Sequence, residues 1–310
     1  GIYDHKLRYD VPSGQTWVTD SLGHTTRYRH ENGLVVETED PLGAVILTEY
    51  DEYNQKRKET DELGNVRTWA YDERGNTVVI VGSDGARAVL AYGEVDAAQA
   101  DLPVKATDAL GGVWDLRYDE LGRLVERTDP TGSTTRFVYQ GSRLSAVVDA
   151  LGNATGFRFD DKGQLIGLFA PDGGATSWHY DYLGRIVSVA DSNGNEQRRS
   201  IDLLGRITLV NDPDGGLRDA EYDGEGDLVH IQDQHRDVRF GYQGMRRLAY
   251  RSEADTTVRF EYDTEERLTG IVNQHGYIYR FELGPTGEVN VESGFDGIRR
   301  VYKRDRKSVV

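Results

Sequence analysis

Short runs in which polar and apolar residues alternate recur along the whole chain, separated by clusters of turn-forming residues. Within residues 134–139, Thr135, Phe137 and Tyr139 fall on one side of an extended chain, and the intervening residues fall on the other. A second run follows at residues 144–148, again rich in β-branched and apolar side chains. The period of two residues and this composition predict β-strands rather than helices.

The runs belong to a repeat whose best-preserved copy occupies residues 108–132. Its pattern is Asp-x-x-Gly, a run ending in Tyr-Asp, then x-x-Gly-Arg-Leu and a second run. Each copy reads as a β-hairpin that a second tight turn joins to the next. We expect residues 1–310 to form one region of about 15 units of roughly 21 residues each. A short insertion near residues 93–104, with one helical turn at 96–101, interrupts it.

The aromatic position of the repeat can be followed from one end of the chain to the other. It falls at Tyr9, Tyr28, Tyr50, Tyr71, Tyr92, Tyr118, Tyr139, Phe159, Tyr180, Ile201, Tyr222, Tyr242, Tyr262, Phe281 and Tyr302. The residues that we expect to hold the repeat together are Tyr71, Asp72, Gly75, Tyr118, Asp119, Gly122, Arg123, Asp129, Gly132, Tyr139, Tyr180, Asp181, Gly184, Arg185, Tyr222 and Asp223.

Each residue type of the motif has a local role. An Asp that opens a turn accepts hydrogen bonds from backbone N–H groups further along the turn, and the Gly adopts a left-handed conformation at low cost. The Tyr ends its strand with a large ring that can pack on the neighbouring unit while its hydroxyl finds a partner. Arg123, Arg185 and Arg206 follow turn glycines, and Arg123 can reach back to Asp119.

Composition favours a wall over a globule. The chain has 36 Gly and 7 Pro, and only 37% of its residues are hydrophobic, which suits a thin repeat protein full of tight turns. A net charge of −16 argues against nucleic acid or an anionic membrane as partner. The chain has no Cys, hence no disulfide and no thiolate metal site. The longest apolar run, Val78–Val81, is too short to span a bilayer but is a hazard if it lies at an open sheet edge.

No candidate for catalysis or metal binding stands out. The acidic residues recur with the turns, so no pair differs from its copies in other units. His230 and His235 lack the spacing of a helical zinc site, and residues 223–227 resemble a calcium loop only in part, because Leu228 stands where a Gly is needed. We therefore expect neither an enzyme nor a bound cofactor or metal. Exposed aromatic rings could still bind sugars, and the candidates are Trp17, Trp69, Trp114 and Trp178.

Three segments carry a resemblance to a known family. YDELGRLVERTDPTG from Tyr118, DALGNATGFRFDDKGQL from Asp149 and WHYDYLGRIVSVADSNGN from Trp178 resemble the YD repeats of bacterial Rhs proteins, of toxin-complex B/C components and of teneurins. The resemblance implies an all-β fold in which repeats form a spiralling sheet that closes into a hollow cocoon. It also implies a role in enclosing a C-terminal toxin polypeptide, with adhesion or carbohydrate binding, as in teneurins, as the alternative.

A length estimate refines this expectation. Roughly 30 strands spaced about 4.8 Å apart give a sheet about 140 Å wide, but strands of six residues make it only about 20 Å tall. Such a belt cannot cap its own ends, so we expect the chain to be a segment of a longer shell. The turns at residues 129–132 and 212–215 resemble the DPxGL segment that ends Rhs shells, but both lack its Leu and read as ordinary turns.

The resemblance also implies partners and a destination. The partners would be the enclosed toxin, the remaining shell repeats and components of a secretion machine. The protein would be made in the bacterial cytoplasm and delivered to a target cell, with a type VI secretion effector as the preferred setting.

Overall fold

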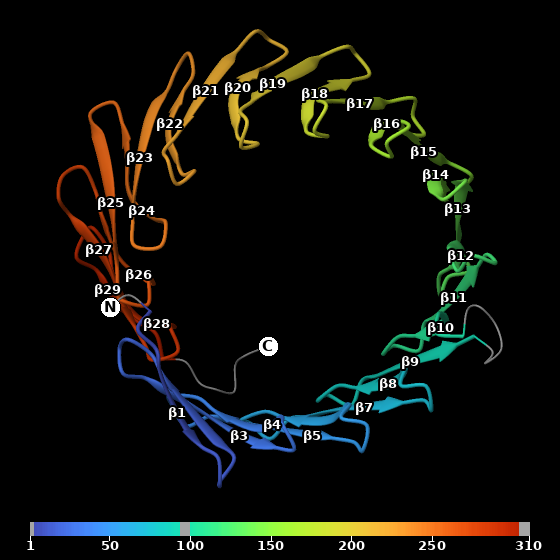
Figure 1. Ribbon diagram of the computed structural model, residues 1–310, viewed down its shortest axis with the longest axis horizontal. Helices are drawn as coiled ribbons and strands as arrows, with labels where there is room; N and C mark the ends of the chain where they lie inside the picture. Colours follow the sequence, from blue (N-terminus) through green and yellow to red (C-terminus); the bar gives the residue numbers. More distant parts are fainter. Residues whose placement is uncertain (1–2, 94–99, 304–310) are drawn as a thin grey trace. The chain divides into compact units, whose positions relative to one another are not determined.

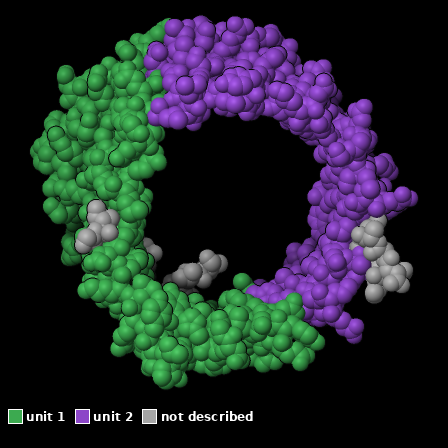
Figure 2. All heavy atoms as spheres, viewed as in Figure 1, with its two compact units in different colours: residues 1–67, 220–310 green, residues 68–219 purple. Residues whose placement is uncertain are grey.

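In the computed structural model, which describes residues 3–93 and 100–303, the chain is all-β, with 29 antiparallel strands and no helix in the described part (Figure 1). The prediction of an all-β repeat with two strands per unit is confirmed. The chain divides into two compact units, residues 1–67 with 220–310 (unit 1) and residues 68–219 (unit 2) (Figure 2).

The first segment of unit 1 contains β1 (Lys6–Asp10), β2 (Gln15–Thr19), β3 (Thr25–Glu31), β4 (Leu34–Glu39), β5 (Val45–Tyr50) and β6 (Lys56–Thr60). Its second segment contains β22 (Leu228–Gln232), β23 (Asp237–Gln243), β24 (Arg247–Glu253), β25 (Thr256–Tyr262), β26 (Leu268–Val272), β27 (Ile278–Leu283), β28 (Val289–Ser293) and β29 (Arg299–Val301).

Unit 2 contains β8 (Thr77–Val81), β9 (Arg87–Tyr92), β10 (Pro103–Thr107), β11 (Val113–Tyr118), β12 (Leu124–Thr128), β13 (Thr134–Gln140), β14 (Arg143–Val148), β15 (Ala154–Phe159), β16 (Leu165–Phe169), β17 (Ala175–Tyr180), β18 (Ile186–Asp191), β19 (Glu196–Ile201) and β20 (Ile207–Asn211). The strands β7 (Val66–Tyr71) and β21 (Leu217–Tyr222) lie across the unit boundaries.

Within each unit, every strand pairs with its neighbours in the sequence. Strand β13, for example, pairs with β14 through Phe137 opposite Val147 and with β12 through Thr135 opposite Arg127. The described strands make no contact with strands other than these neighbours, so no second layer covers the sheet. Among the described residues, Val238 and Val291 are the only buried hydrophobic residues, and neither is fully buried. The accessible surface of 20027 Å² exceeds the roughly 13,000 Å² expected for a compact chain of this length.

A β-bulge marks the aromatic position of most hairpins. The register shifts one residue before Tyr50, Tyr71, Tyr118, Tyr139, Phe159, Tyr180, Ile201, Tyr242 and Tyr262. A bulge adds one residue to one strand and increases the local twist, so the motif residue stands where each hairpin bends.

Two of the expected aromatic positions were wrong. The bulge of β3 falls before His30, and that of β27 falls before Leu283, so Tyr28 and Phe281 lie two residues too early. Residues two apart on a strand share one face, and the alternation of side chains cannot tell them apart. The position of the bulge is set by the turn that follows the strand, not by the nearest aromatic residue.

The condition for the expected edge hazard is not met among the described strands. Val78–Val81 lie in β8, which pairs with β7 on one side and with β9 on the other. The run is apolar because the strand is interior to the sheet, where its backbone groups are paired.

The predicted insertion lies between two paired strands. Strands β9 and β10 pair across it, and β10 already begins at Pro103, inside the range expected for the insertion. Most of the helical turn expected at residues 96–101 lies outside the described residues. Ala100 and Asp101, which are described, form a turn.

Unit 1 brings together two segments that are far apart in the sequence. The backbone N–H of Ser21 donates to Glu265 Oε1 at 2.7 Å, and the Ser21 hydroxyl donates to Thr264 Oγ1 at 2.7 Å. The backbone N–H of Tyr3 donates to the Thr264 carbonyl at 3.1 Å, and His5 Nε2 lies 3.2 Å from Glu265 Oε2. We call these five residues the clasp. The clasp joins two turns and the residues Tyr3 and His5. No described strand of one segment pairs with a strand of the other, so the contact involves no strand pairing.

Candidate functional site

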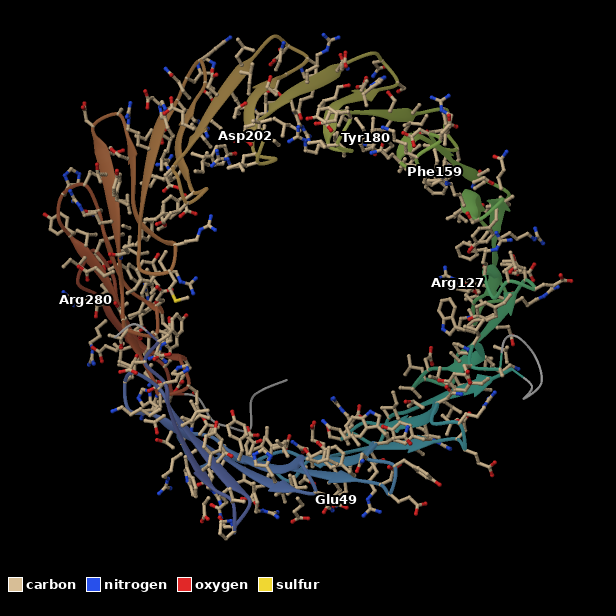
Figure 3. The ribbon with its side chains drawn as sticks, in the orientation of Figure 1. Glu49, Arg127, Phe159, Tyr180, Asp202 and Arg280 are labelled. Carbon is tan, nitrogen blue, oxygen red and sulfur yellow. The ribbon has the colours of Figure 1, made fainter. Side chains whose placement is uncertain are left out.

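One face of the repeat sheet carries the aromatic residues. In β15, Phe157 and Phe159 are half-buried, whereas Arg158 between them is exposed. The side chains of Phe159 and Tyr180 point to the concave side of the curved sheet of unit 2 (Figure 3). We call this side the aromatic face; in unit 2, strand alternation and register assign to it Trp69, Tyr71, Trp114, Tyr118, Phe137, Tyr139, Phe157, Phe159, Trp178 and Tyr180.

The opposite face is charged. Glu126 lies 3.3 Å from Arg117 and 3.5 Å from Arg136, the residues opposite it on the two neighbouring strands. In unit 1, Glu49 and Arg280 also point to the convex side (Figure 3). Each exposed cross-strand ion pair contributes little stability. Together the pairs keep this face hydrated and chemically distinct from the aromatic face.

The structure places the predicted motif residues at equivalent points of successive units. The tyrosines stand at or next to the last residue of their strands, the Asp residues open the following turns, and the glycines stand three residues later. These are Tyr71, Asp72 and Gly75; Tyr118, Asp119, Gly122 and Arg123; Tyr180, Asp181, Gly184 and Arg185; Tyr222 and Asp223; Tyr139 at the end of β13; and Asp129 and Gly132 in the turn before β13.

The tyrosine hydroxyls bond to the backbone of the preceding unit. Tyr139 Oη donates to the carbonyl of Leu124 at 3.0 Å, and Tyr180 Oη donates to that of Leu165 at 2.7 Å. The same bond, 14 or 15 residues back, is made by Tyr50, Tyr92, Tyr118, Tyr242 and Tyr262. Burial raises the pKa of Tyr118 and of Tyr262. The ring and its hydroxyl thus tie each hairpin to the one before it.

The turn carboxylates organise the loops. Asp181 Oδ1 accepts the backbone N–H groups of Leu183 at 2.9 Å and Arg185 at 3.0 Å, and Oδ2 accepts Arg185 Nε at 2.6 Å. The Arg123 side chain, followed by its backbone N–H, lowers the pKa of the Asp119 carboxyl. These bonds to the charged form favour ionisation and fix the turn.

Several arginines in or just after the turns also reach the following unit. Arg185 Nη1 donates to the carbonyl of Asp202 at 2.6 Å, and Arg143 Nη1 donates to that of Asp160 at 2.7 Å. The Arg123 guanidinium bonds the Gly141 carbonyl and lies 4.4 Å from the centre of the Tyr139 ring. These arginines therefore bond the following unit, whereas the tyrosines bond the preceding one.

The candidate sugar-binding tryptophans are half-buried in the wall. Trp114 lies under Arg127, 5.3 Å from the guanidinium carbon, and Trp17 lies under Arg8 at 3.7 Å. Trp69 and Trp178 are equally half-buried, two residues before their tyrosines. All four rings pack against the sheet rather than standing exposed.

The other candidate residues for catalysis or metal binding do not come together in one site. His230 lies 2.9 Å from Asp237, whereas the described bond of His235 is from its backbone to Asp233. Asp223 accepts backbone N–H groups of its own turn, and Asp227 pairs with Arg246 at 2.5 Å. Among the residues that the structure describes, no three acidic or imidazole groups are placed to hold a metal ion.

A polar cluster interrupts the aromatic face, and sequence reasoning missed it. Gln197 and Arg199 stand four and two residues before Ile201, where most other units carry aromatic, aliphatic or small residues. Gln197 donates to Asp212 Oδ1 at 2.8 Å, and Arg218 bonds the same carboxylate at 2.8 and 2.9 Å. Two features of the sequence could have revealed the cluster. Ile201 replaces the aromatic residue of the repeat, and the charged residue Arg199 stands two positions before it.

Comparisons with known proteins agree with this geometry. The family profile described as Teneurin YD-shell matches residues 110–242, which contain four of the tyrosines that bond the preceding unit. The resemblance to YD repeats expected from the sequence is confirmed.

Two curated bacterial relatives contain similar YD-repeat sequence. Double-stranded DNA deaminase toxin A of Burkholderia cenocepacia is 29% identical over 172 residues, which is 55% of this chain and 12% of that protein. Toxin protein Tse5 of Pseudomonas aeruginosa is 31% identical over 131 residues, 41% of this chain and 10% of that protein. The chain thus spans about a tenth of the length of these relatives.

Solved structures show the same fold. The crystal structure of TcdB2-TccC3-TEV superposes with a TM-score of 0.79 at 14% identity, covering 94% of this chain and 18% of that one. The Photorhabdus luminescens Tc holotoxin pore superposes with a TM-score of 0.58 at 12% identity, covering 94% and 20%. In the described residues, no helix is long and apolar enough to cross a membrane.

Proposed function

We propose that this YD-repeat chain is part of the wall of a shell that encloses a toxin polypeptide. The observation that carries the proposal is the aromatic face, which is apolar, concave within unit 2 and covered by no second layer of the described protein. A sheet normally buries its apolar face against another layer. An apolar face that lacks a second layer is suited to contact with another polypeptide.

The names of the relatives support a toxin as that polypeptide. Both curated relatives are named as toxins, and the matched repeats occupy only a small part of each. We infer that these 310 residues are one segment of a longer shell, that the remaining repeats complete it, and that the toxin belongs to the same parent chain.

The proposed mechanism is steric. A wall of half-buried rings with few fully buried groups offers weak, repeated apolar contacts rather than one specific pocket. The polar cluster of Gln197, Arg199, Asp212 and Arg218 adds hydrogen-bonding groups at one point of the same face. We propose that the segment is not an enzyme and uses no cofactor, because its carboxylates and arginines pair within turns or across neighbouring strands.

The same bacterial relatives also support a proposal for the cellular setting. We propose that the parent protein is made in the bacterial cytoplasm, leaves the cell through a secretion machine and is delivered to a target cell, as a type VI effector. Neither nucleic acid nor a membrane is proposed as a partner, in keeping with the net charge of −16.

The test places a photo-crosslinking residue on either face of one strand. In the full-length parent protein, p-benzoylphenylalanine replaces either Phe159, on the aromatic face, or the adjacent exposed Arg158. We expect position 159 to cross-link to peptides of the toxin region and position 158 to give none, as read by mass spectrometry of the digested product.

The two positions differ only in the face they occupy, so each is the control for the other. Cross-links to toxin from position 158, or from neither position, would refute enclosure by this face. Binding of glycans to the purified chain, lost when Trp114 or Trp178 is replaced by Ala, would instead favour the adhesion alternative.

A further inference from the structure

The charged residues on the strands of the aromatic face of unit 2 are almost all arginines. Strand alternation and register place Arg127, Arg199 and Arg218 on this face, and Arg127 lies on the concave side in Figure 3. Among the described strand residues of unit 2, the only acidic one that register assigns to this face is Asp191, whose carboxylate accepts N–H groups of its own turn. The whole chain has a net charge of −16, so this face is opposite in charge to the protein that carries it.

The convex face of the same unit carries charges of both signs. Arg198 Nη2 lies 2.8 Å from Glu196 Oε2, and Lys105 Nζ lies 3.4 Å from Asp115 Oδ1. Such pairs neutralise the cations of that face locally. The excess of positive charge therefore belongs to the aromatic face and is not a general feature of the sheet.

Arg199 forms no ion pair among the described residues. Its Nε and Nη2 donate to the amide oxygen of Gln197 at 3.1 and 2.9 Å. The amide nitrogen of Gln197 donates in turn to Asp212, a carboxylate that Arg218 already neutralises. A neutral group thus orients the half-buried guanidinium of Arg199 and leaves its charge uncompensated.

Arg127 is the second arginine of this face without an ion pair in the described part of the chain. Its guanidinium carbon lies 5.3 Å from the centre of the Trp114 ring, and such a contact orients the cation without neutralising it. The Thr131 hydroxyl first, and the Arg127 charge last, lower the pKa of Asp129, but the hydrogen bonds of that carboxylate go to its own turn. The side chain of Arg127 is exposed, so its N–H donors face any polypeptide that covers the sheet.

A polypeptide that covers these arginines has to supply acceptors for them. Removing an unpaired guanidinium from water is unfavourable, and a carboxylate offsets this best because it accepts two parallel N–H bonds. We therefore propose that Arg127 and Arg199 bind Asp or Glu side chains of the enclosed polypeptide, while its apolar side chains pack on the neighbouring rings. The inference rests on the proposed enclosure and adds the chemistry of the contact: the segments that lie against unit 2 are acidic and apolar.

The experiment replaces each guanidinium with an amine that a carbodiimide can couple to a contacting carboxylate. In the full-length parent protein carrying Arg127→Lys or Arg199→Lys, we expect amide bonds to Asp or Glu of the toxin region, identified by mass spectrometry of the digested product. The yield should exceed that of Thr155→Lys, at a half-buried position of the same face, by at least about fivefold, because only the arginine positions are matched by carboxylates.

Two further variants control the chemistry. Arg218→Lys should couple to Asp212 within the wall, which shows that the reagent reaches the aromatic face. Arg136→Lys, on the convex face, should couple to Glu126 and not to the toxin. Added salt should reduce coupling to the toxin from positions 127 and 199 but not photo-cross-linking from position 159, because salt screens ion pairs and leaves apolar contacts in place.

The outcomes separate this inference from the enclosure on which it rests. If position 159 cross-links to the toxin but positions 127 and 199 couple to it no better than position 155, enclosure stands and the ionic contact is refuted. If the purified parent protein holds nucleic acid that an Arg127→Gln, Arg199→Gln variant lacks, the arginines bind phosphate and the inference is overturned. If position 159 gives no cross-link to the toxin, enclosure by this face fails, and the inference fails with it.

Discussion

At the scale of the residue, the YD motif is a set of bonds between neighbouring units. Tyr139 donates backwards to the Leu124 carbonyl, and Arg185 donates forwards to the Asp202 carbonyl while its Nε holds Asp181. Backbone carbonyls freed by the bulges and turns are thereby satisfied by side chains, which the half-buried wall requires. Each of these hydrogen bonds contributes little stability, but the repeat forms them many times along the chain.

Removing one tyrosine hydroxyl tests the backward bond. Tyr139→Phe should lower the free energy of unfolding by about 1 kcal/mol, because the Leu124 carbonyl loses its donor while the ring remains. Tyr182→Phe, at an exposed turn position, is the control and should have no effect. Urea titration gives the comparison, and equal effects of the two variants would contradict the assigned role.

The turn carboxylates predict a dependence on pH. The pKa of Asp119 is lowered in the folded chain by the Arg123 side chain, so its contribution to stability is complete above the ordinary carboxyl pKa and is lost as the pH falls through the folded value. Asp119→Asn should therefore destabilise at pH 7 and flatten the loss on acidification. Glu120→Gln, in the same exposed turn, should retain the wild-type pH profile of the urea midpoint.

At this scale the sequence predicts interactions within a turn better than interactions between units. The Asp119–Arg123 pair is four residues apart, and turn geometry alone brings its members together. The partner of Tyr139 could not be predicted, because a bond to Leu124 depends on strand register and on the bulge before the ring. The polar cluster around Asp212 depends on register in the same way.

At the scale of the element, turns set the position of each hairpin. Gly132 and Gly205 close such turns with φ of 87° and 88°, a conformation that L residues rarely adopt. Glu266 occupies the equivalent position with φ of 53°, and its carboxylate bonds the Met245 N–H and Arg247 of the preceding hairpin. There, hydrogen bonds offset the strain that glycine avoids.

Two glycines separate backbone strain from crowding. An added methyl group meets nothing within 4 Å at Gly205 or at Gly224, but only Gly205 has a positive φ. Gly205→Ala should destabilise by about 1 kcal/mol, whereas Gly224→Ala should be neutral or slightly stabilising. Thermal unfolding of the two variants decides, and equal losses would show that the left-handed backbone is not the cause.

At the scale of the whole molecule, stability comes from neighbours rather than from a core. With only two buried hydrophobic residues among those described, the free energy of the fold is close to a sum over adjacent strand pairs. The clasp is the exception, because it joins residues more than 240 positions apart within unit 1. It is therefore the place where distant repeats can be uncoupled without breaking a strand pair.

Acid should open the clasp. The side-chain bond from Ser21, and then its backbone bond and His5, lower the pKa of Glu265, so the clasp is complete above the ordinary carboxyl pKa and weakens as the pH falls through the folded value. The other charged groups beside Ser21 are Asp20 and His24, which pair with each other at 3.1 Å.

Hydrogen exchange can follow the opening. Glu265→Gln should raise amide exchange at Ser21 at neutral pH and remove its dependence on acidification, while exchange in β13 of unit 2 stays unchanged. Glu62→Gln, an exposed turn residue, is the control. A wild-type clasp that exchanges equally at all pH values, after correction for intrinsic rates, would exclude Glu265 as the sensitive group.

The sequence predicted the architecture of the wall far better than its surfaces. Alternation and turn chemistry are local, and they foretold strands, hairpins and phase almost throughout. The clasp depends on contacts between segments far apart in the sequence, and the polar cluster depends on strand register, and a local pattern encodes neither.

The pairing of each strand with its predecessor has a consequence for biosynthesis. Since a strand's first partner has already left the ribosome when the strand emerges, the sheet can be extended hairpin by hairpin during translation, without waiting for distant sequence. In a parent protein whose toxin follows the repeats, the container would be laid down before its contents are synthesised. The nascent toxin would then emerge beside an apolar surface already in place, and the producing cell would be shielded from the first moment of synthesis.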